Sequence, residues 1–139
     1  MTDGVLFICL GNSCRSIMAE ALARQLFPDP LKVGSAGIRP LGFIPDETLE
    51  VLVESGIATD GLWSKGLADV DLANFPLLVN LTDYPWEGII PADFQGRLIE
   101  HPVIDPFGHP LAIYRQALEA VRRFISQELP PLLFTNFTN

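Results

Sequence analysis

The sequence predicts an α/β fold, in which a single doubly wound domain holds about four parallel strands with helices on both faces. Two observations support this prediction. Short apolar runs of strand length alternate along the chain with segments that have helical periodicity. The chain also has 139 residues, of which 48% are hydrophobic, so it can bury a core without metals or disulfides. No repeat or low-complexity linker divides it, and we expect one domain over residues 1–139.

The first predicted unit is a strand, a tight polar loop and a helix. Residues 5–8 are branched or aromatic apolar residues, which is typical of a strand buried on both faces. From Ser16 to Phe27 apolar residues recur at helical spacing, and Pro28 is expected to close this helix. The loop between strand and helix contains both cysteines of the chain.

The remaining segments continue the alternation. Three further strands are expected, at residues 31–36, 75–81 and 97–103. Two further helices are expected, at residues 45–55 and 111–125. Pro130 and Pro131 should stop the last helix, because proline lacks an N–H donor and its ring clashes with the preceding turn. Segments 60–74 and 83–95 are irregular, and loops of this length in a small domain are often functional.

Charge and hydropathy exclude several classes of function. The formal net charge of −8 opposes binding to nucleic acid, which needs a basic face. The apolar run at residues 5–10 is too short for a signal peptide or a membrane span. Two cysteines within one short window are typical of reactive thiols in a reducing compartment. We therefore expect a cytoplasmic protein that has no membrane or nucleic-acid partner and needs no metal or other cofactor.

The loop after the first strand has the residue types of an oxyanion site. Cys9 is followed by five residues and then by Arg15 and Ser16. Successive backbone N–H groups in such a turn converge on an anion, and the start of the next helix adds positive potential. Arg15 offers a planar fork for two phosphate oxygens. The same field stabilises a thiolate, so Cys9 is the predicted nucleophile, and the Ser16 hydroxyl is expected to donate to its sulfur.

The residues between Cys9 and Arg15 are expected to bind the anion through their backbone. They are Leu10, Gly11, Asn12, Ser13 and Cys14. Gly11 allows a close approach, and Asn12 tolerates the left-handed geometry that holds the shape of such a loop. A single buried cysteine or a single arginine is more often an ordinary structural residue. Their joint spacing between a strand and a helix favours the functional interpretation.

Residues 5–16, followed by Met18-Ala19-Glu20, resemble the amino-terminal signature of the low-molecular-weight protein tyrosine phosphatases. The similarity continues through residues 34–37 and 105–108, so it spans nearly the whole chain. The resemblance implies a phosphatase that hydrolyses phosphate monoesters, phosphotyrosine above all, through a phosphocysteine intermediate on Cys9.

The same resemblance implies roles for residues outside the loop. Asp105, the first residue of an Asp-Pro pair, matches the general acid that protonates the leaving group and then activates water. Phe107 matches an aromatic residue that stacks on the substrate ring, and Ser35 matches a serine that bonds to the phosphate loop. On its local dipeptide alone, Asp105 could equally be a turn residue.

The aromatic residues of the two irregular segments leave two interpretations open. Trp63, Tyr84 and Trp86 either wall the cleft or pin the long loops to the core. His101 and His109 lack metal-ligand spacing with each other or with the cysteines, which favours surface or structural roles for both.

Thiol-dependent arsenate reductases share this fold and signature, so the resemblance leaves a second activity open. Members that couple to thioredoxin keep further cysteines just after the third strand, where this chain has Thr82 and no cysteine follows Cys14. Hydrolysis needs no second thiol, and we therefore favour a phosphatase acting on a phosphorylated protein or a small phosphate ester. Arsenate reduction with external thiols is the alternative. The departures from the phosphatase pattern at Thr82 and Phe107 leave the substrate range open, and the oligomeric state is open as well.

A non-catalytic oxyanion-binding module on the same fold is a third hypothesis, because fold does not fix function. A binding module needs the anion donors of the loop. It has no use for the nucleophile Cys9 or the acid Asp105, so their joint presence argues against this hypothesis.

Overall fold

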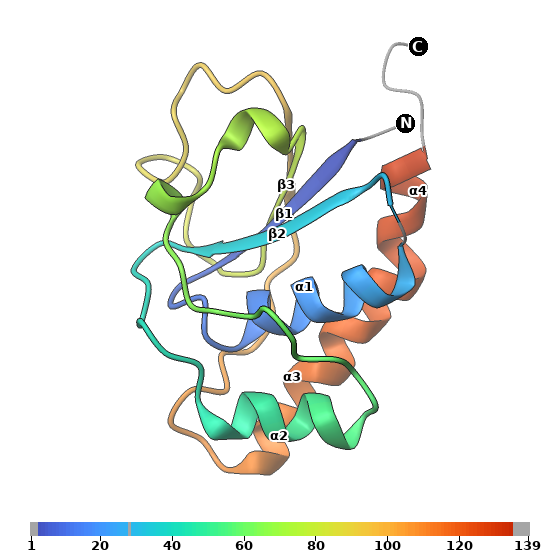
Figure 1. The fold of residues 1–139 in the computed structure, drawn as a ribbon. Coiled ribbons are helices and arrows are strands. Elements are labelled where there is room, and N and C mark those ends of the chain that lie inside the picture. The colour runs from blue at the N-terminus through green and yellow to red at the C-terminus, as the bar shows by residue number, and fades with distance from the viewer. Residues whose placement is uncertain (1–2, 28, 135–139) are drawn as a thin grey trace.

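The computed structural model describes residues 3–27 and 29–134 and places a parallel β-sheet at the centre of the molecule (Figure 1). The sheet has four strands in the order β2-β1-β3-β4, and each neighbouring pair is parallel. The strands are β1 (Gly4–Cys9), β2 (Lys32–Gly37), β3 (Leu77–Asn80) and β4 (Arg97–Glu100). The predicted α/β fold with four parallel strands is confirmed. The carboxyl ends of these strands meet at one edge of the sheet, where open α/β folds bind their ligands.

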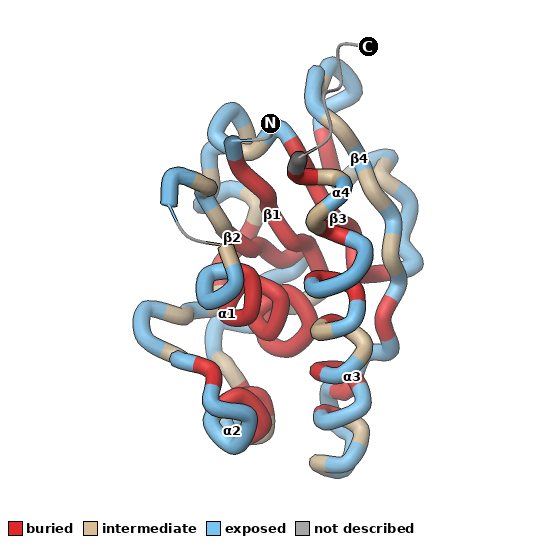
Figure 2. Tube along the Cα trace, turned by 90° about the vertical axis from the view of Figure 1, so that its right-hand side faces the viewer, coloured by how far each residue is buried: buried red, intermediate tan, exposed pale blue. Residues whose placement is uncertain are grey.

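Four α-helices in the described part of the chain pack on one face of the sheet. They are α1 (Arg15–Leu26), α2 (Asp46–Glu54), α3 (Leu111–Arg123) and α4 (Leu129–Phe134). Val5 and Phe7 of β1 join a buried core with residues of all four helices, and Figure 2 shows β1 and much of α1 as buried. Pro28, expected to close α1, lies outside the described residues. None of the described helices has the length and apolar character needed to cross a membrane.

The opposite face of the sheet is covered by loops and by single-turn 3₁₀ helices. Leu6 and Ile8, which alternate with the helix-facing residues of β1, form a second core on this face. Its cover includes η1 (Leu67–Asp69), η2 (Leu72–Asn74) and the loop at residues 83–95. The expected helices on both faces are thus α-helices on one face and 3₁₀ helices on the other, because the Gly, Pro and Asp residues of these segments disfavour longer helices.

The prediction that Pro130 and Pro131 stop the last helix is wrong. A π-helical turn, η3 (Phe124–Glu128), follows α3 directly, and both prolines lie in the first turn of α4. The N–H of Leu129 bonds to the carbonyl of Phe124, five residues back. This wider turn resets the hydrogen-bond pattern before the prolines, whose missing N–H groups then fall where a new α-helix has unpaired donors. As a result, Leu129 and Leu133 of α4 are buried in the core.

Candidate active site

The loop at residues 10–14 connects the carboxyl end of β1 to the start of α1, as predicted. Its carbonyl groups accept hydrogen bonds from the segment that follows β2: Ile38 N–H donates to Cys9 O at 3.0 Å, Arg39 N–H to Leu10 O at 2.8 Å and Leu41 N–H to Gly11 O at 2.9 Å. In a trans peptide the N–H of the next residue points opposite to the carbonyl. The N–H groups of Leu10, Gly11 and Asn12 therefore point away from the segment that follows β2.

A glycine of β2 allows the loop to lie this close to the sheet. A Cβ atom on Gly37 would lie 2.8 Å from the backbone nitrogen of Asn12 and 2.9 Å from Leu10 O. Any side chain at Gly37 would therefore push the loop away. Thr48 of α2 supports the loop from the other side, because its hydroxyl donates to Ser13 O at 2.8 Å.

Cys9 lies in a cleft of about 190 Å³ at the carboxyl edge of the sheet. The cleft is lined by loop residues together with Arg15, Arg39, Leu41, Asp105 and Phe107. The Cys9 sulfur lies 2.9 Å from the hydroxyl oxygen of Ser16, in the first turn of α1. The structure thus brings the predicted nucleophile, arginine and acid to one cleft, and it places Ser16 directly against the sulfur.

Arg15 is 94% buried, and its guanidinium is divided between the protein and the cleft. Nη1 donates to the carbonyls of Leu81 at 3.1 Å and Val103 at 3.0 Å, which fixes the plane of the group. Nη2 forms an ion pair with Asp105 Oδ2 at 3.6 Å. Among the described residues, Nε has no hydrogen-bond partner although it is buried. A bidentate anion on the Nε and Nη2 edge would therefore take the unpaired Nε and replace Asp105 at Nη2.

Asp105 has a contact typical of a turn residue and also lies on the cleft, as an acid would. Its Oδ1 accepts a hydrogen bond from the Phe107 N–H at 3.1 Å, which is the contact of a turn residue. Its side chain also lines the Cys9 cleft and is 44% exposed, so the carboxyl is accessible from the cleft. The turn contact fixes the carboxyl near the cleft and leaves Oδ2 on the side of Arg15.

Asn12 adopts the left-handed geometry expected of it, with φ of 46°. Its side-chain amide donates to the Ser16 hydroxyl at 2.7 Å and to the Ser35 hydroxyl at 2.9 Å, so Ser35 contacts the loop as the resemblance implied. Lys65 donates to the Asn12 carbonyl oxygen through its main-chain N–H at 2.8 Å. Sequence reasoning missed Lys65, because it lies in an irregular segment 53 residues away from Asn12.

Cys14 also lines the cleft, but its thiol has other surroundings. It is 98% buried and contacts the hydroxyl of Ser13 at 3.6 Å. Burial raises the pKa of the Cys14 thiol above its ordinary value, against the lowering effect of hydrogen bonds from Thr48 and Ser13. Cys14 is therefore a protonated thiol at neutral pH.

The three aromatic residues with open roles separate in the structure. Tyr84 lines a second cleft of about 410 Å³ next to Arg15 and Asp105. Trp86 packs against the second core and pins its loop. Trp63 is 54% exposed, and its ring lies 5.3 Å from the Lys65 ammonium.

His101 and Thr82 both have structural contacts. The ring of His101 packs on that of Phe124 at a centroid distance of 4.3 Å, which is a structural role. Thr82 lies in a hydrogen-bonded turn, where its hydroxyl donates to Asn80 Oδ1 at 2.6 Å and accepts from the Tyr84 N–H at 3.0 Å.

Comparison with known proteins places this geometry in a family. Residues 4–134 match the sequence profile of the family described as low molecular weight phosphotyrosine protein phosphatase. Over 83 residues, the chain is 41% identical to the low molecular weight protein-tyrosine-phosphatase YfkJ of Bacillus subtilis (strain 168), a match that covers 54% of this chain and 53% of that protein. Over 77 residues, it is 40% identical to an arsenate reductase of Staphylococcus aureus (strain Newman), covering 55% of this chain and 58% of the reductase. These matches thus span little more than half of each relative.

A solved structure matches over nearly the full length. The tyrosine phosphatase Wzb from Escherichia coli K30, in complex with sulphate, superposes with a TM-score of 0.85 and covers 95% of this chain and 99% of its own. The sequences are 22% identical, so this comparison establishes the fold and not the activity.

Proposed function

Because this chain belongs to the low molecular weight phosphotyrosine protein phosphatase family, a family of enzymes, we propose that it hydrolyses phosphate monoesters, phosphotyrosine above all. The observation that carries the proposal is the joint placement of Cys9, Arg15 and Asp105 on one cleft. Nucleophile, anion receptor and acid then face the same bound phosphate. The Nε and Nη2 edge of Arg15 would receive two phosphate oxygens, once the anion replaces Asp105 at Nη2.

In the first step, the Cys9 thiolate attacks phosphorus. An S–P bond forms while the P–O bond to the leaving group breaks, and Asp105 donates its proton to the departing oxygen. The loop N–H groups and Arg15 stabilise the charge on the three equatorial oxygens.

In the second step, water attacks the phosphocysteine. Asp105, now a carboxylate, takes a proton from the water as the new O–P bond forms and the S–P bond breaks. The sulfur leaves as a thiolate, and the Ser16 hydroxyl 2.9 Å away stabilises this charge. The step releases inorganic phosphate. It leaves Cys9 as a thiolate and Asp105 protonated, as they were at the start.

The walls of the cleft support an aryl ester as substrate. Leu41 and Phe107 are partly exposed apolar side chains that line the cleft above the Cys9 loop. A phenyl ring attached to the phosphate can pack between such side chains, which favours phosphotyrosine over a small polar ester.

The activity test is hydrolysis of an aryl phosphate as a function of pH. Because a Cys9 thiolate and a protonated Asp105 are needed together, the rate should follow a bell centred on the acidic side of neutrality. Asp105→Asn should lower kcat by a factor of about 10²–10⁴ and remove the descending limb that reports the acid. The matched control is Asp93→Asn, the same charge change at an exposed position of the loop at residues 83–95. An unchanged profile in Asp105→Asn would reassign Asp105 to the turn alone.

Arsenate reduction is the second candidate, and the 40% identity to the Staphylococcus aureus reductase is the observation that favours it. The chain has two cysteines, both in the loop, and Thr82 occupies a hydrogen-bonded turn after β3. Reduction would therefore need an external thiol. Arsenate with thioredoxin and its reductase should give little NADPH consumption, and glutathione or mycothiol with a glutaredoxin is the fair control. Robust consumption in either system, with negligible hydrolysis of aryl phosphates, would make the reductase the better assignment.

A further inference from the structure

The second cleft, of about 410 Å³, adjoins the Cys9 cleft and is larger than it. The two clefts share Leu10, Arg15 and Asp105 in their linings, so a phosphate bound at Arg15 lies at their common border. The volume is within the range of about 300–1,000 Å³ that is typical of ligand sites. The second cleft therefore has room for a part of the substrate beyond the phosphorylated side chain.

Strand order places the second cleft on the β3 side of the Cys9 loop. Asp83 and Tyr84 of this cleft follow β3, whereas Arg39 of the Cys9 cleft follows β2. Because β1 lies between β2 and β3, these side chains lie on opposite sides of the loop that follows β1. A peptide whose phosphotyrosine is bound at Cys9 would thus meet Arg39 on one side and Asp83 on the other.

The turn that carries Asp83 and Tyr84 is held through its main chain. Asn80, buried at the end of β3, donates through Nδ2 to Tyr84 O at 2.8 Å and accepts from the Thr82 N–H at 2.9 Å. The Tyr84 N–H donates to the Thr82 hydroxyl at 3.0 Å. The side chains of Asp83 and Tyr84 stay exposed, and the Asp83 carboxylate has no ion pair with any residue that the structure describes. Both side chains are therefore preorganised for a ligand.

The lining has the groups that recognise a basic side chain. The Asp83 carboxylate can pair with a guanidinium or an ammonium, and the face of the Tyr84 ring attracts the same cation. Ile104, which is 54% exposed, can pack against the aliphatic stem. Under the proposed function, Arg15 is matched by the bound phosphate and Asp105 is protonated. Asp83 then carries the charge that a substrate meets in this cleft.

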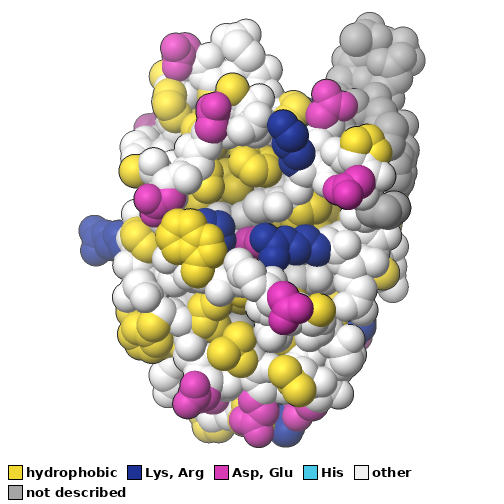
Figure 3. Space-filling model, viewed as in Figure 1, with side chains coloured by type: hydrophobic (Ala, Val, Ile, Leu, Met, Phe, Trp, Pro, Cys, Tyr) yellow, Lys and Arg dark blue, Asp and Glu magenta, His cyan; other side chains and the backbone are white. Residues whose placement is uncertain are grey.

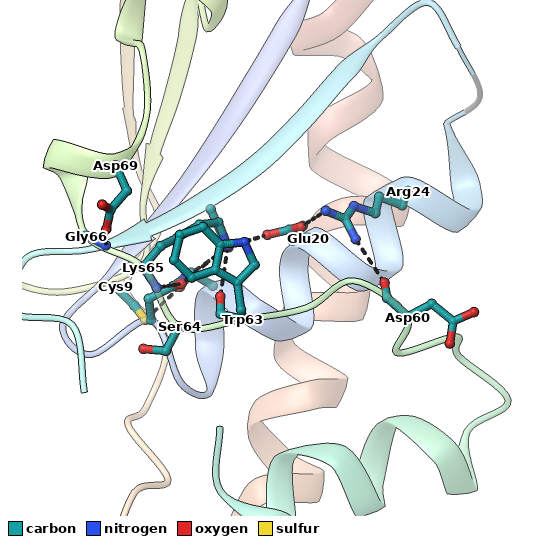
Figure 4. A network of polar contacts seen from close by, with 12 residues as sticks. Cys9, Glu20, Arg24, Asp60, Trp63, Ser64, Lys65, Gly66 and Asp69 are labelled. Atoms are coloured by element: carbon teal, nitrogen blue, oxygen red, sulfur yellow. Dashed lines mark hydrogen bonds and ion pairs between the residues drawn. The ribbon is translucent and has the colours of Figure 1, made fainter. Parts of the chain in front are cut away.

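The charged groups behind the Cys9 loop are matched within the protein. Figure 4 shows Lys65 and Arg24 directed at Glu20 from two sides, and both form ion pairs with its carboxylate. Neither cation lines the Cys9 cleft or the second cleft. Recognition of the substrate outside its phosphate therefore depends on the two clefts and not on this group.

We propose that the second cleft binds a basic side chain of the phosphorylated protein, beside the phosphotyrosine and on one side of it, and that Asp83 and Tyr84 determine this preference. The inference rests on the proposed function, in which the phosphotyrosine occupies the Cys9 cleft. On the opposite side Arg39 repels a basic side chain, so the preference is directional.

The test is the binding of phosphotyrosine peptides to Cys9→Ser, measured by fluorescence anisotropy. This variant lacks the nucleophile, so the measurement needs no turnover. One peptide set carries arginine directly before or directly after the phosphotyrosine, and a second set carries citrulline at the same places. Citrulline has nearly the shape of arginine without its charge, so the ratio of the two dissociation constants isolates recognition of the cation.

We expect the arginine peptide to bind about tenfold tighter than the citrulline peptide on one side of the phosphotyrosine, and about equally on the other. The ratio should decrease as salt screens the ion pair. Because the net charge of −8 attracts any basic peptide, equal preferences on both sides would indicate long-range attraction and overturn the proposal. A ratio near one on both sides would overturn it as well.

Substitutions in the Cys9→Ser background test the two residues. Asp83→Lys should reverse the preference, so that the citrulline peptide binds tighter, and Tyr84→Leu should lower the ratio to about threefold. The matched control is Asp93→Lys, the same charge change at an exposed residue that lines neither cleft. It should keep the ratio near tenfold. Equal effects of Asp83→Lys and Asp93→Lys would contradict a specific contact.

The outcomes separate this inference from the proposed function. Hydrolysis of aryl phosphates by the wild type, with equal binding of arginine and citrulline peptides, would refute the role of the second cleft and leave the proposed function intact. Absence of both hydrolysis and phosphopeptide binding would refute the two together.

Discussion

Cys9, the last residue of β1, and Cys14, the last residue of the loop at residues 10–14, lie close in sequence, but the structure gives their thiols different partners. The Cys9 sulfur lies 2.9 Å from the Ser16 hydroxyl oxygen and lines the cleft. The Cys14 thiol is enclosed near Ser13, and burial raises its pKa. Thiolates, not thiols, are nucleophiles, so the two residues should differ in reactivity at neutral pH.

Selective alkylation tests this difference. With limiting iodoacetamide at pH 7, the folded protein should take up label on Cys9 before Cys14, because the Cys14 thiol is buried and protonated. Fragment-ion mass spectrometry separates the two sites. Inorganic phosphate should slow the labelling of Cys9 by occupying the loop. Preferential labelling of Cys14, or no protection by phosphate, would contradict the assignment of the nucleophile.

Some residues of the site could be predicted from the sequence and others could not. The loop from Cys9 to Ser16 could be predicted because its residues are contiguous and each has a local chemical reason. Lys65 could not, since its role depends on a contact with Asn12 across 53 residues. The only local signal was Glu20, a charged residue among the buried positions of α1, which requires a buried partner.

Among the elements, strands and helices followed the periodicity of the sequence because each buries an apolar face. The end of α3 did not follow the prediction, because the rule that proline stops a helix applies to a regular α-helix. Here the π turn at residues 124–128 accommodates Pro130 and Pro131 and lets α4 pack into the core. A π turn of this kind depends on tertiary packing, so the residue types of the segment do not predict it.

The packing of α3 against the start of α1 predicts a specific alkaline sensitivity. Tyr114 of α3 is 99% buried, and burial, together with the neighbouring Cys14, raises its pKa to about 12. Since the unfolded value is near 10, the neutral phenol contributes stability below about pH 10 that is lost as the pH rises toward about 12. Thermal melting of the wild type should therefore fall more steeply between pH 10 and pH 11.5 than that of Tyr114→Phe. Parallel curves would contradict the burial of an ionisable phenol at this contact.

For the whole molecule, the topology explains why the site has this composition. Segments that follow all four parallel strands meet at one edge: the loop after β1, residues 38–41 after β2, Leu81 after β3, and residues 102–107 after β4. Arg15, which directly follows the loop after β1, contacts two of the other segments: its guanidinium reaches Leu81 after β3, and Val103 and Asp105 after β4. Residues distant in sequence thus become one site only through strand order.

The overall charge is opposite to what a phosphate site needs. The net charge is −8, and Figure 3 shows acidic side chains scattered over the face it draws. Under the proposed function, an anionic substrate would be held by the local donors of the loop and Arg15, against the long-range field of the protein. The proposed function therefore requires that selection for phosphorylated substrates depend on the geometry of the cleft and not on the charge of the surface.

The central claim is that Cys9 carries the phosphoryl group during hydrolysis. Rapid quenching of Asp105→Asn during turnover of an aryl phosphate, followed by mass spectrometry, tests it most directly, because loss of the acid and base should slow hydrolysis of the intermediate and let it accumulate. The account predicts a stoichiometric phosphoryl group on Cys9 and complete loss of turnover in Cys9→Ser. Turnover that persists in Cys9→Ser, or a phosphoryl group on Ser16 in place of Cys9, would contradict it.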